Sequence, residues 1–462
     1  MHNFIFRWIT KLRQNYWFWP SVMTVCAVLL GFVLPYLDAR VGSDWIREAG
    51  FVRTIEVDGA RAILTTLATA TLGVAGVAFS VTIVAVSFAS SNYGPRLIGN
   101  FMADRKNQVI LGIFVATFVY CITVLTTVHA STETPGTTLD AFVPHLSLYF
   151  ALLLTLAAVG ALIAYIHHIP ESINIMNLTA EIGAKLQSSV IRMLDEEDSR
   201  MRDTPDAHHM DVEAWFEEPQ ADDAHVVRAE VTGFVQKFDL ENLAALALKN
   251  GIQIVLHRSP GDFVVMGETV LSTRPARSGA GAIDRQMRDC FTQGDNRTDA
   301  QDILFLSDQL VEVLGRALSP GINDPRTAML CLDWLRAGLV AFAARPPSQP
   351  AKSDDPVLYR RVAFEDMLNR SFAEMRQCVA TNRTVTLQAM DVLTDIAQAS
   401  FQEPMARACV QQICQLAGSA MELLDESVAR EEIATELKRA LQAVAAGGAH
   451  CRDPIADHAA PD

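Results

Sequence analysis

The sequence predicts a membrane α-helical fold with four transmembrane helices, followed by a cytosolic α+β domain that contains a small β-barrel-like unit and a helical C-terminal part. Three observations carry this prediction. Half of the 462 residues are hydrophobic and only 20% are charged. The apolar residues are concentrated before residue 170, in four long stretches without Asp, Glu, Lys or Arg. After residue 170 they recur at helical spacing or in short runs between turn residues, as in soluble domains.

Each of the four apolar stretches is long enough to cross a bilayer, which takes about 20 mostly apolar residues. They run over residues 17–37, 62–89, 109–128 and 146–166. The first is too long for a cleavable signal peptide, and no small-x-small cleavage site follows it. We therefore expect residues 1–170 to form a four-span transmembrane domain.

Basic residues in the short loops predict the orientation of these helices. Lys and Arg lie before the first stretch and between the second and third, at Arg7, Lys11, Arg13, Arg96, Arg105 and Lys106. The loop between the third and fourth stretches has neither. This pattern places both termini in the cytoplasm. The loops on the other side lack cysteine, and Arg outnumbers Lys, which favours a multi-pass protein of the bacterial inner (plasma) membrane.

The second stretch carries the most distinctive pattern. About 34 residues from 62 to 95 contain no charge, which corresponds to roughly 50 Å of helix, more than a bilayer core requires. Small or hydroxylated residues fall on one face of this helix, at Thr66, Thr69, Gly73, Gly76, Ser80 and Ser87. Two interpretations stay open: the stripe packs against other helices, or it lines the pore of an oligomer.

Ionisable side chains other than Cys and Tyr are absent from the first three stretches. Ion-coupled pumps and proton relays normally carry such groups within the membrane, so the sequence argues against a pump and leaves a passive pore open. His167 and His168 follow the fourth stretch, just before Pro170. They either close the helix at the membrane surface or contact ions at a cytosolic mouth, where histidine titrates near neutral pH.

The rest of the chain divides by pattern into four segments. Residues 171–225 are expected to form a connecting helix and an acidic linker, because apolar residues recur every three or four positions before an irregular acidic run. Residues 226–275 predict a small β-rich, barrel-like domain, with short strands between turn signals. Residues 276–447 predict a helical cytosolic domain, and residues 448–462 a disordered tail.

Charge and cysteine content exclude several classes of function. The net charge of −15 falls almost entirely after residue 170, so the basic footprint of a nucleic-acid-binding protein is missing. None of the eight cysteines forms a C-x-x-C pair, so neither a zinc site nor a thioredoxin-like motif is indicated, and free thiols in a reducing compartment are expected. Phosphate-binding loops and zinc-protease motifs are also missing. We therefore predict no metal, no cofactor and no catalytic residues, hence no enzyme.

One polar group in the helical part stands out as a candidate site for a ligand or a subunit contact. It comprises Arg297, Asp302, Arg316, Asn323, Asp324 and Thr327. Asp324 followed by Pro325 is typical of a helix N-cap and first turn. Because Asp302 and Arg316 lie about four turns apart on one predicted helix, Arg297 and the 319–327 turn should lie at its opposite ends. The alternative to a binding role is that these residues are caps and buried salt bridges.

Several phrases resemble a bacterial family of predicted membrane proteins with a domain of unknown function. The most specific is RALSPGINDPRTA at 316–328, and others are FASSNYGPRLIGNF, LGIFVATFVY and IHHIPESI. The resemblance covers nearly the whole chain. It implies a four-span membrane module with a cytosolic domain, and it implies no substrate, cofactor or catalytic residue.

These observations predict an oligomeric, channel-like protein that passes ions or small solutes through a pore lined by the second span, with a cytosolic regulatory domain. Its partners would be membrane lipid, other copies of the chain, and the permeating ions or solutes. The alternative is a membrane-anchored sensor or scaffold that binds a ligand or protein through its cytosolic domain. A third class, a membrane enzyme, needs a polar catalytic pocket that the sequence does not assemble.

Overall fold

The computed structural model describes residues 17–41, 55–94, 104–130, 132–134, 137–139, 141–202, 224–274, 281–345 and 355–447. The chain divides into two compact units, residues 1–177 and 178–462, hereafter the membrane unit and the C-terminal unit. The predicted tail at 448–462 lies outside the described residues, as does most of the predicted acidic linker, at 203–223.

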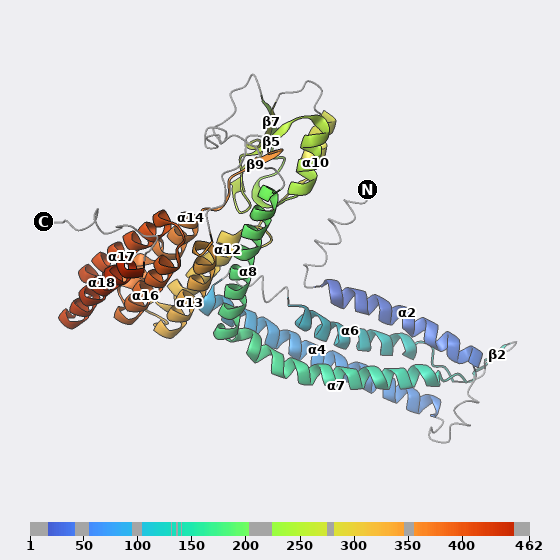
Figure 1. Ribbon diagram of the computed structural model, residues 1–462. Coiled ribbons are helices and arrows are strands. Elements are labelled where there is room, and N and C mark those ends of the chain that lie inside the picture. Colours follow the sequence, from blue (N-terminus) through green and yellow to red (C-terminus); the bar gives the residue numbers. More distant parts are fainter. Residues whose placement is uncertain are drawn as a thin grey trace. The chain divides into compact units, whose positions relative to one another are not determined.

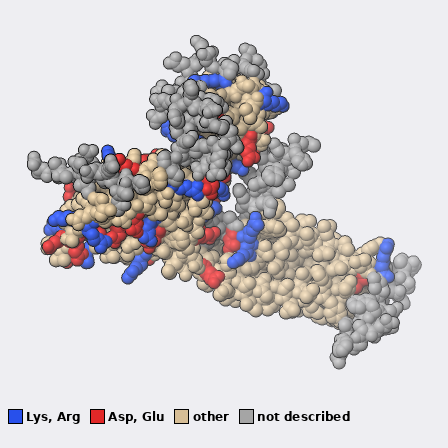
Figure 2. All heavy atoms as spheres, in the orientation of Figure 1, with Lys and Arg blue, Asp and Glu red and all other residues tan. Residues whose placement is uncertain are grey.

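The membrane unit consists of long apolar helices that lie side by side (Figure 1). They are α2 (Phe18–Val41), α4 (Val57–Tyr93), α6 (Arg105–Leu125) and α7 (His145–Ile173), and a short hairpin, β1 (Thr132–Thr134) and β2 (Thr137–Leu139), precedes α7. All four helices are long and apolar enough to cross a membrane, which agrees with the prediction of four long apolar helices. Figure 2 shows their surface as an almost uncharged body with charged side chains toward its two ends.

Small side chains bring the helices of the membrane unit together. The buried face of α4 consists largely of alanines, at positions 60, 68, 75, 78, 85 and 89. Gly112 of α6 lies against Met23 of α2, and Gly31 of α2 lies against Thr123 of α6. Such residues allow the close helix approach on which packing in lipid depends.

The C-terminal unit contains most of α8 (Ile175–Arg202), which follows α7 after a single non-helical residue, Asn174. One face of α8 is buried along its length, at Leu178, Ile182, Leu186, Val190 and Leu194. This is the three-to-four-residue spacing that predicted a helix here. Gly183 faces the indole ring of Trp334, and Gly338 faces the side chain of Leu186, so α8 packs closely on α13 (Pro325–Ala343).

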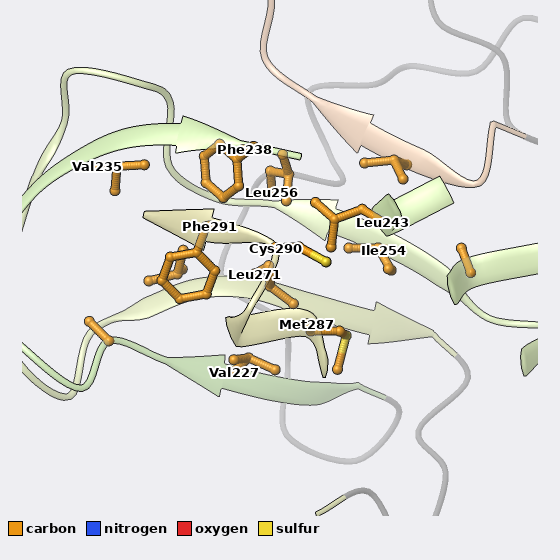
Figure 3. Close-up of a cluster of buried hydrophobic side chains, with 14 of the residues drawn as sticks. Val227, Val235, Phe238, Leu243, Ile254, Leu256, Leu271, Met287, Cys290 and Phe291 are labelled. Carbon is orange, nitrogen blue, oxygen red and sulfur yellow. The ribbon is translucent and has the colours of Figure 1, made fainter. Parts of the chain in front are cut away.

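The β-rich part of the C-terminal unit consists of two separate sheets. One has the order β3 (His225–Arg228), β7 (Thr269–Arg274), β5 (Gln253–Leu256), β9 (Val357–Tyr359), and the other the order β6 (Phe263–Val264), β4 (Gly233–Phe238), β8 (Phe291–Gly294). Helices α10 (Leu240–Asn250) and α11 (Gly281–Arg288) complete this part. Side chains from both sheets fill one core, drawn in Figure 3, which includes Val227, Val235, Phe238, Ile254, Leu271 and Phe291.

The prediction of a barrel-like unit is wrong. A barrel requires every strand to have two hydrogen-bonded neighbours, and among the described residues no strand of one sheet pairs with a strand of the other. The shortness of the strands explains this. Strand β6 has two residues and pairs with β4 only through Gly233–Val264 and Phe234–Phe263. Instead of closing into a barrel, the two sheets bury their apolar faces in one shared core.

The remaining elements of the C-terminal unit are helical. They are α12 (Ile303–Ala317), α13, α14 (Phe364–Leu368), the π-helical turn η2 (Asn369–Ala373), α15 (Arg376–Ala380), α16 (Arg383–Ala399), α17 (Glu403–Leu423) and α18 (Ser427–Gly447). Asp302, Asp324 and Asn382 cap the first turns of α12, α13 and α16 through their carboxylate or amide oxygens. The mostly helical C-terminal part agrees with the sequence prediction.

Candidate functional site

The small-residue stripe of α4 lies on the surface of the membrane unit. Each of its six residues is exposed: Thr66, Thr69, Gly73, Gly76, Ser80 and Ser87. At 3.6 residues per turn the stripe falls roughly opposite the alanine face that packs against α6 and α7. A methyl group added at Gly73 or Gly76 would touch nothing. The stripe therefore does not pack against the described helices of its own chain.

Large apolar side chains border the stripe on both sides. Leu72, Phe79 and Ile83 flank one edge, and Val77, Val81, Val84 and Phe88 the other, all of them exposed. The hydroxyl groups of Thr66, Thr69 and Ser80 donate to the carbonyl oxygens four residues earlier, at 2.7, 2.9 and 2.9 Å. Since these bonds use the hydroxyl protons, the oxygen lone pairs point outward as acceptors.

The two histidines at the end of α7 have different surroundings. His168 Nε2 lies 2.5 Å from Asp104 Oδ2, and its side chain is only 16% exposed. Asp104 also caps α6 by accepting from the Lys106 amide at 2.9 Å, so His168 joins the end of α7 to the start of α6. His167 is 80% exposed and lies 3.3 Å from Glu171 on the same helix.

The structure places Arg297 in a buried ion-pair network of the C-terminal unit. Its Nε donates to Asp302 Oδ2 at 2.8 Å and its Nη1 to Asp308 Oδ2 at 2.5 Å. Arg370 Nη1 donates to the same Asp308 oxygen at 3.0 Å. The two carboxylates are almost fully buried, whereas the Arg370 side chain is 40% exposed. The network is therefore balanced in charge and open to solvent on the side of Arg370.

Burial and pairing act against each other on the ionisation of this network. Burial raises the pKa of the Asp302 carboxyl, an effect that the hydrogen bond and charge of Arg297 offset only in part. For Arg297, burial alone lowers the pKa, but the hydrogen bonds and charges of Asp302 and Asp308 outweigh it, so the pKa of Arg297 is raised. The guanidinium also lies 5.2 Å from the ring centre of Phe305. The arginine is thus firmly held as a cation.

Sequence reasoning missed Asp308 and Arg370, as well as the neighbouring pair Ser307 and Ser371. Asp308 lies on the buried face of α12, and a carboxylate within a mostly apolar helix was the signal that could have found it. Arg370 and Ser371 come from η2, which lies more than 60 residues further along the chain, and the hydroxyl of Ser371 pairs with that of Ser307 at 2.9 Å. Local patterns carry no information on that pairing, although π-helical turns are frequent at functional sites.

The turn between α12 and α13 is held by hydrogen bonds among its own residues and the end of α12. Asp324 accepts from the Thr327 hydroxyl at 2.6 Å and from the Thr327 amide at 3.2 Å, while its own amide donates to Ala317 O at 2.7 Å. Asn323 adopts a left-handed conformation with φ of 48°, which asparagine tolerates better than most residues. Arg316 lies 3.7 Å from Glu312. These residues form a helix connection, and α12 separates them from Arg297 and Asp302.

Within the part of the chain that the structure describes, no group of three His, Cys, Asp or Glu side chains is placed to hold a metal ion. In the network around Arg297, the two arginines and the two carboxylates pair with one another. The residues after α12 form hydrogen bonds with backbone groups at the end of α12 and the start of α13. Both arrangements are those of structural cross-links. The predicted site residues that are left facing outward include the stripe of α4 and His167.

Comparison with known proteins places the chain among membrane proteins. The family model described as "Predicted membrane protein (DUF2254)" matches residues 13–395. Uncharacterized proteins of Mycobacterium tuberculosis (strain H37Rv) and Mycobacterium bovis are each 28% identical over 429 residues, which cover 90% of this chain and 78% of the relative. No solved structure matches the chain.

Proposed function

The chain belongs to the DUF2254 family of predicted membrane proteins, and from this premise we propose that it forms a homo-oligomeric channel in which α4 of each subunit lines a shared pore. The channel passes ions or small solutes, and the C-terminal unit regulates it. The observation that carries this proposal is the exposure of the stripe from Thr66 to Ser87, on the face of α4 that is turned away from the other described helices.

An exposed stripe of small residues is better matched by another helix than by lipid. Gly73 and Gly76 have no side chain to cover the helix backbone, and the larger exposed side chains of Phe79 and Val77 project on either side of them. Small residues at such positions allow helices to approach closely in membranes. A second copy of α4, related by rotation about an axis along the membrane normal, supplies the same groove and the same ridges.

The chemistry of the stripe suits weak, multiple-site binding of a permeating ion. The hydroxyl oxygens of Thr66, Thr69 and Ser80 present lone pairs outward, and the stripe carries no charge that would trap an ion. Conduction requires binding strong enough to admit an ion and weak enough to release it. Because the negative charge of the chain lies mostly after residue 170, the C-terminal unit would raise the local concentration of cations on its side of the membrane. We therefore expect small cations to pass in preference to anions.

The proposed location is a bacterial inner membrane, with both termini in the cytoplasm. Support comes from the Lys and Arg residues before the first helix and between the second and third. In this orientation His167 and His168 lie at the cytoplasmic end of α7. Reporter fusions, one type active only in the cytoplasm and the other only outside it, placed after residues 130 and 462 check the assignment. A cytoplasmic signal at residue 130 would contradict it.

Cysteine cross-linking of the full chain in nanodiscs tests the oligomer. The natural cysteines are first replaced, and Ser80→Cys is compared with Val81→Cys. Both positions are exposed, but they lie about 100° apart around α4, which makes Val81→Cys a matched control. We expect Ser80→Cys to form cross-linked dimers rapidly and Val81→Cys to do so slowly. Equal rates for the two would refute a shared α4 interface.

Flux through proteoliposomes tests the pore. A bulky side chain on the axis should obstruct it, so Gly76→Leu is expected to reduce potassium flux at least about tenfold, whereas Val81→Leu, on the adjoining exposed face, leaves it near the wild-type value. If a verified oligomer of the wild-type chain shows no flux, the proposal of conduction is refuted. The proposal of an oligomer would still stand.

A second candidate function, a membrane-anchored binding protein, is favoured by an apolar patch on the β-rich part. Val231, Phe263, Val265 and Met266 are each about half exposed or more, and the Met266 amide donates to the Thr232 hydroxyl at 3.1 Å, which holds the two segments together. A thermal-shift screen of small ligands on the full chain tests this function. It gains support if a ligand stabilises the wild type but not Phe263→Asp, and it fails if both respond alike.

A further inference from the structure

The helical part of the C-terminal unit contains a pocket among the turn η2, α15, α16 and α17. The space inside it, with its open mouth included, is about 220 Å³. Most of its wall consists of buried apolar side chains, which are Phe372, Met375, Val379, Ala389, Leu393 and Leu416. The pocket is therefore separate from the stripe of α4 and from the apolar patch around Phe263.

Two polar side chains interrupt this apolar wall. Gln412 of α17 is only 7% exposed, and its Nε2 donates to Asn369 Oδ1 of η2 at 3.0 Å. This bond leaves Gln412 Oε1 to face Arg376 of α15, whose Nη2 donates to it at the long distance of 3.4 Å. Gln412 therefore helps to position the guanidinium but does not neutralise its charge.

Arg376 keeps donors that the chain does not use. Its Nε is buried and has no hydrogen-bond partner among the described residues, and no carboxylate of those residues pairs with the guanidinium. The other arginines of this region differ, because Arg297 and Arg370 both pair with Asp308. A buried donor without a partner is rare in folded proteins, and it commonly indicates a bound water or ligand.

A carboxylate is the anion that this wall suits best. The planar guanidinium offers parallel donors that match the two oxygens of a carboxylate. Phosphate or sulfate would also attract the charge, but such ions carry oxygens on every side. Burial of those oxygens against Phe372 and Leu393 without hydrogen bonds would be costly. The wall therefore favours a carboxylate that carries an apolar tail.

The size of the pocket limits that tail to a few carbon atoms. Its closed inner part has room for about one water-sized group, and a methyl group has a similar size. At about 30 Å³ for each such group, the whole space holds about seven of them, and part of that space lies in the mouth. A molecule as small as butyrate fits this limit, whereas a long fatty acid exceeds it.

We propose that this pocket binds a short-chain carboxylate, of which butyrate is the representative. The carboxylate accepts from Nε and one Nη nitrogen of Arg376, and the tail contacts the apolar side chains opposite. Binding forms and breaks no covalent bond. The proposal goes beyond the proposed channel and is independent of it, because the pocket consists only of residues of the C-terminal unit.

Saturation-transfer nuclear magnetic resonance of the full chain in detergent tests the proposal, with butyrate at pH 7 as the probe. We expect transfer to the methyl protons of butyrate that saturates with concentration and that neither phosphate nor the uncharged butyramide suppresses. Arg376→Gln removes the cation and should weaken binding about tenfold or more, the effect of losing a charged hydrogen-bond partner. Arg407→Gln is the matched control and should bind as the wild type, because Arg407 pairs with Glu403 on the surface of α17.

A second variant keeps the test decisive if Arg376→Gln fails to fold. Gln412→Glu preserves the size of the side chain and places a carboxylate of the chain itself beside Arg376, so it should also weaken butyrate binding about tenfold or more. The proposal is overturned if the wild type shows no saturable binding of butyrate, or if phosphate or butyramide displaces it. It is equally overturned if either variant folds and binds butyrate as the wild type does.

Discussion

Removal of Arg297 should destabilise the C-terminal unit more than removal of any surface arginine. The Arg297→Ala change leaves Asp302 and Asp308, whose side chains are 3% and 5% exposed, without their shared guanidinium. Arg370 still pairs with Asp308, so Asp302 becomes the uncompensated buried charge. Loss of one partner of a buried pair typically costs about 3–5 kcal/mol. We expect a loss in the free energy of unfolding toward the lower end, about 3 kcal/mol, because Asp308 keeps a partner.

The pH dependence of this variant has a defined sign. Burial already raises the pKa of Asp302, and Arg297 offsets the effect in part. Without Arg297 the folded chain holds a proton on Asp302 more tightly than the unfolded chain does. The contribution of Asp302 to the stability of Arg297→Ala is therefore fully present below the carboxyl pKa of the unfolded chain and is lost as the pH rises through the higher pKa of the folded chain.

Urea unfolding of the full chain in detergent measures this effect. Trp334, which packs against Gly183 inside the C-terminal unit, reports unfolding once the other tryptophans are replaced by Phe. Arg336→Ala is the matched control, because Arg336 pairs with Asp395 at 2.6 Å with both side chains more than 40% exposed, and such surface pairs contribute at most about 1 kcal/mol. If Arg297→Ala loses no more stability than Arg336→Ala, the network is not a buried cross-link.

Three further outcomes follow from local geometry. Gly183→Ala should destabilise by about 1–3 kcal/mol because its methyl group overlaps an indole ring, whereas Gly315→Ala, in the open on a helix, should stabilise by about 0.5–1 kcal/mol. Both are measured by the same urea unfolding, and equal effects would contradict the packing. Asp324→Ala removes the α13 cap and should cost about 0.5–2 kcal/mol in that assay; no loss would show that the cap is dispensable. Burial raises the pKa of the Cys331 thiol, so iodoacetamide should modify the exposed Cys378 first in mass spectrometry of the folded chain, and faster labelling of Cys331 would contradict its burial.

The membrane helices were predictable because their cause is local. A backbone in lipid must satisfy its hydrogen bonds internally, so an apolar run without charge specifies a helix whatever its neighbours are. Helix caps are local for a similar reason, and Asp324 caps the helix that its neighbour Pro325 predicts. Asp38 and Ser147 are hydrogen-bonded although they lie more than 100 positions apart, and no local pattern connects them.

The β-rich part shows where local reasoning failed. Its strand runs were visible between turn residues, but strand β8 and the parallel strand β9 come from residues 291–294 and 357–359, well beyond the predicted barrel. Strand pairing is a contact between distant segments, and its partners depend on which apolar faces cover each other. Two open sheets with one shared core satisfy that requirement without closure.

The sequence by itself determined the four apolar helices, the capped start of α13, and the alignment of Thr66 through Ser87 on one face of a helix, because each follows from spacing along the chain. Only the tertiary structure decided that this face points away from the other described helices, that Arg370 joins Arg297 at Asp308, and that Asp38 caps the first turn of α7. These outcomes depend on which helices pack together, and packing is chosen by the fit of surfaces far apart in sequence.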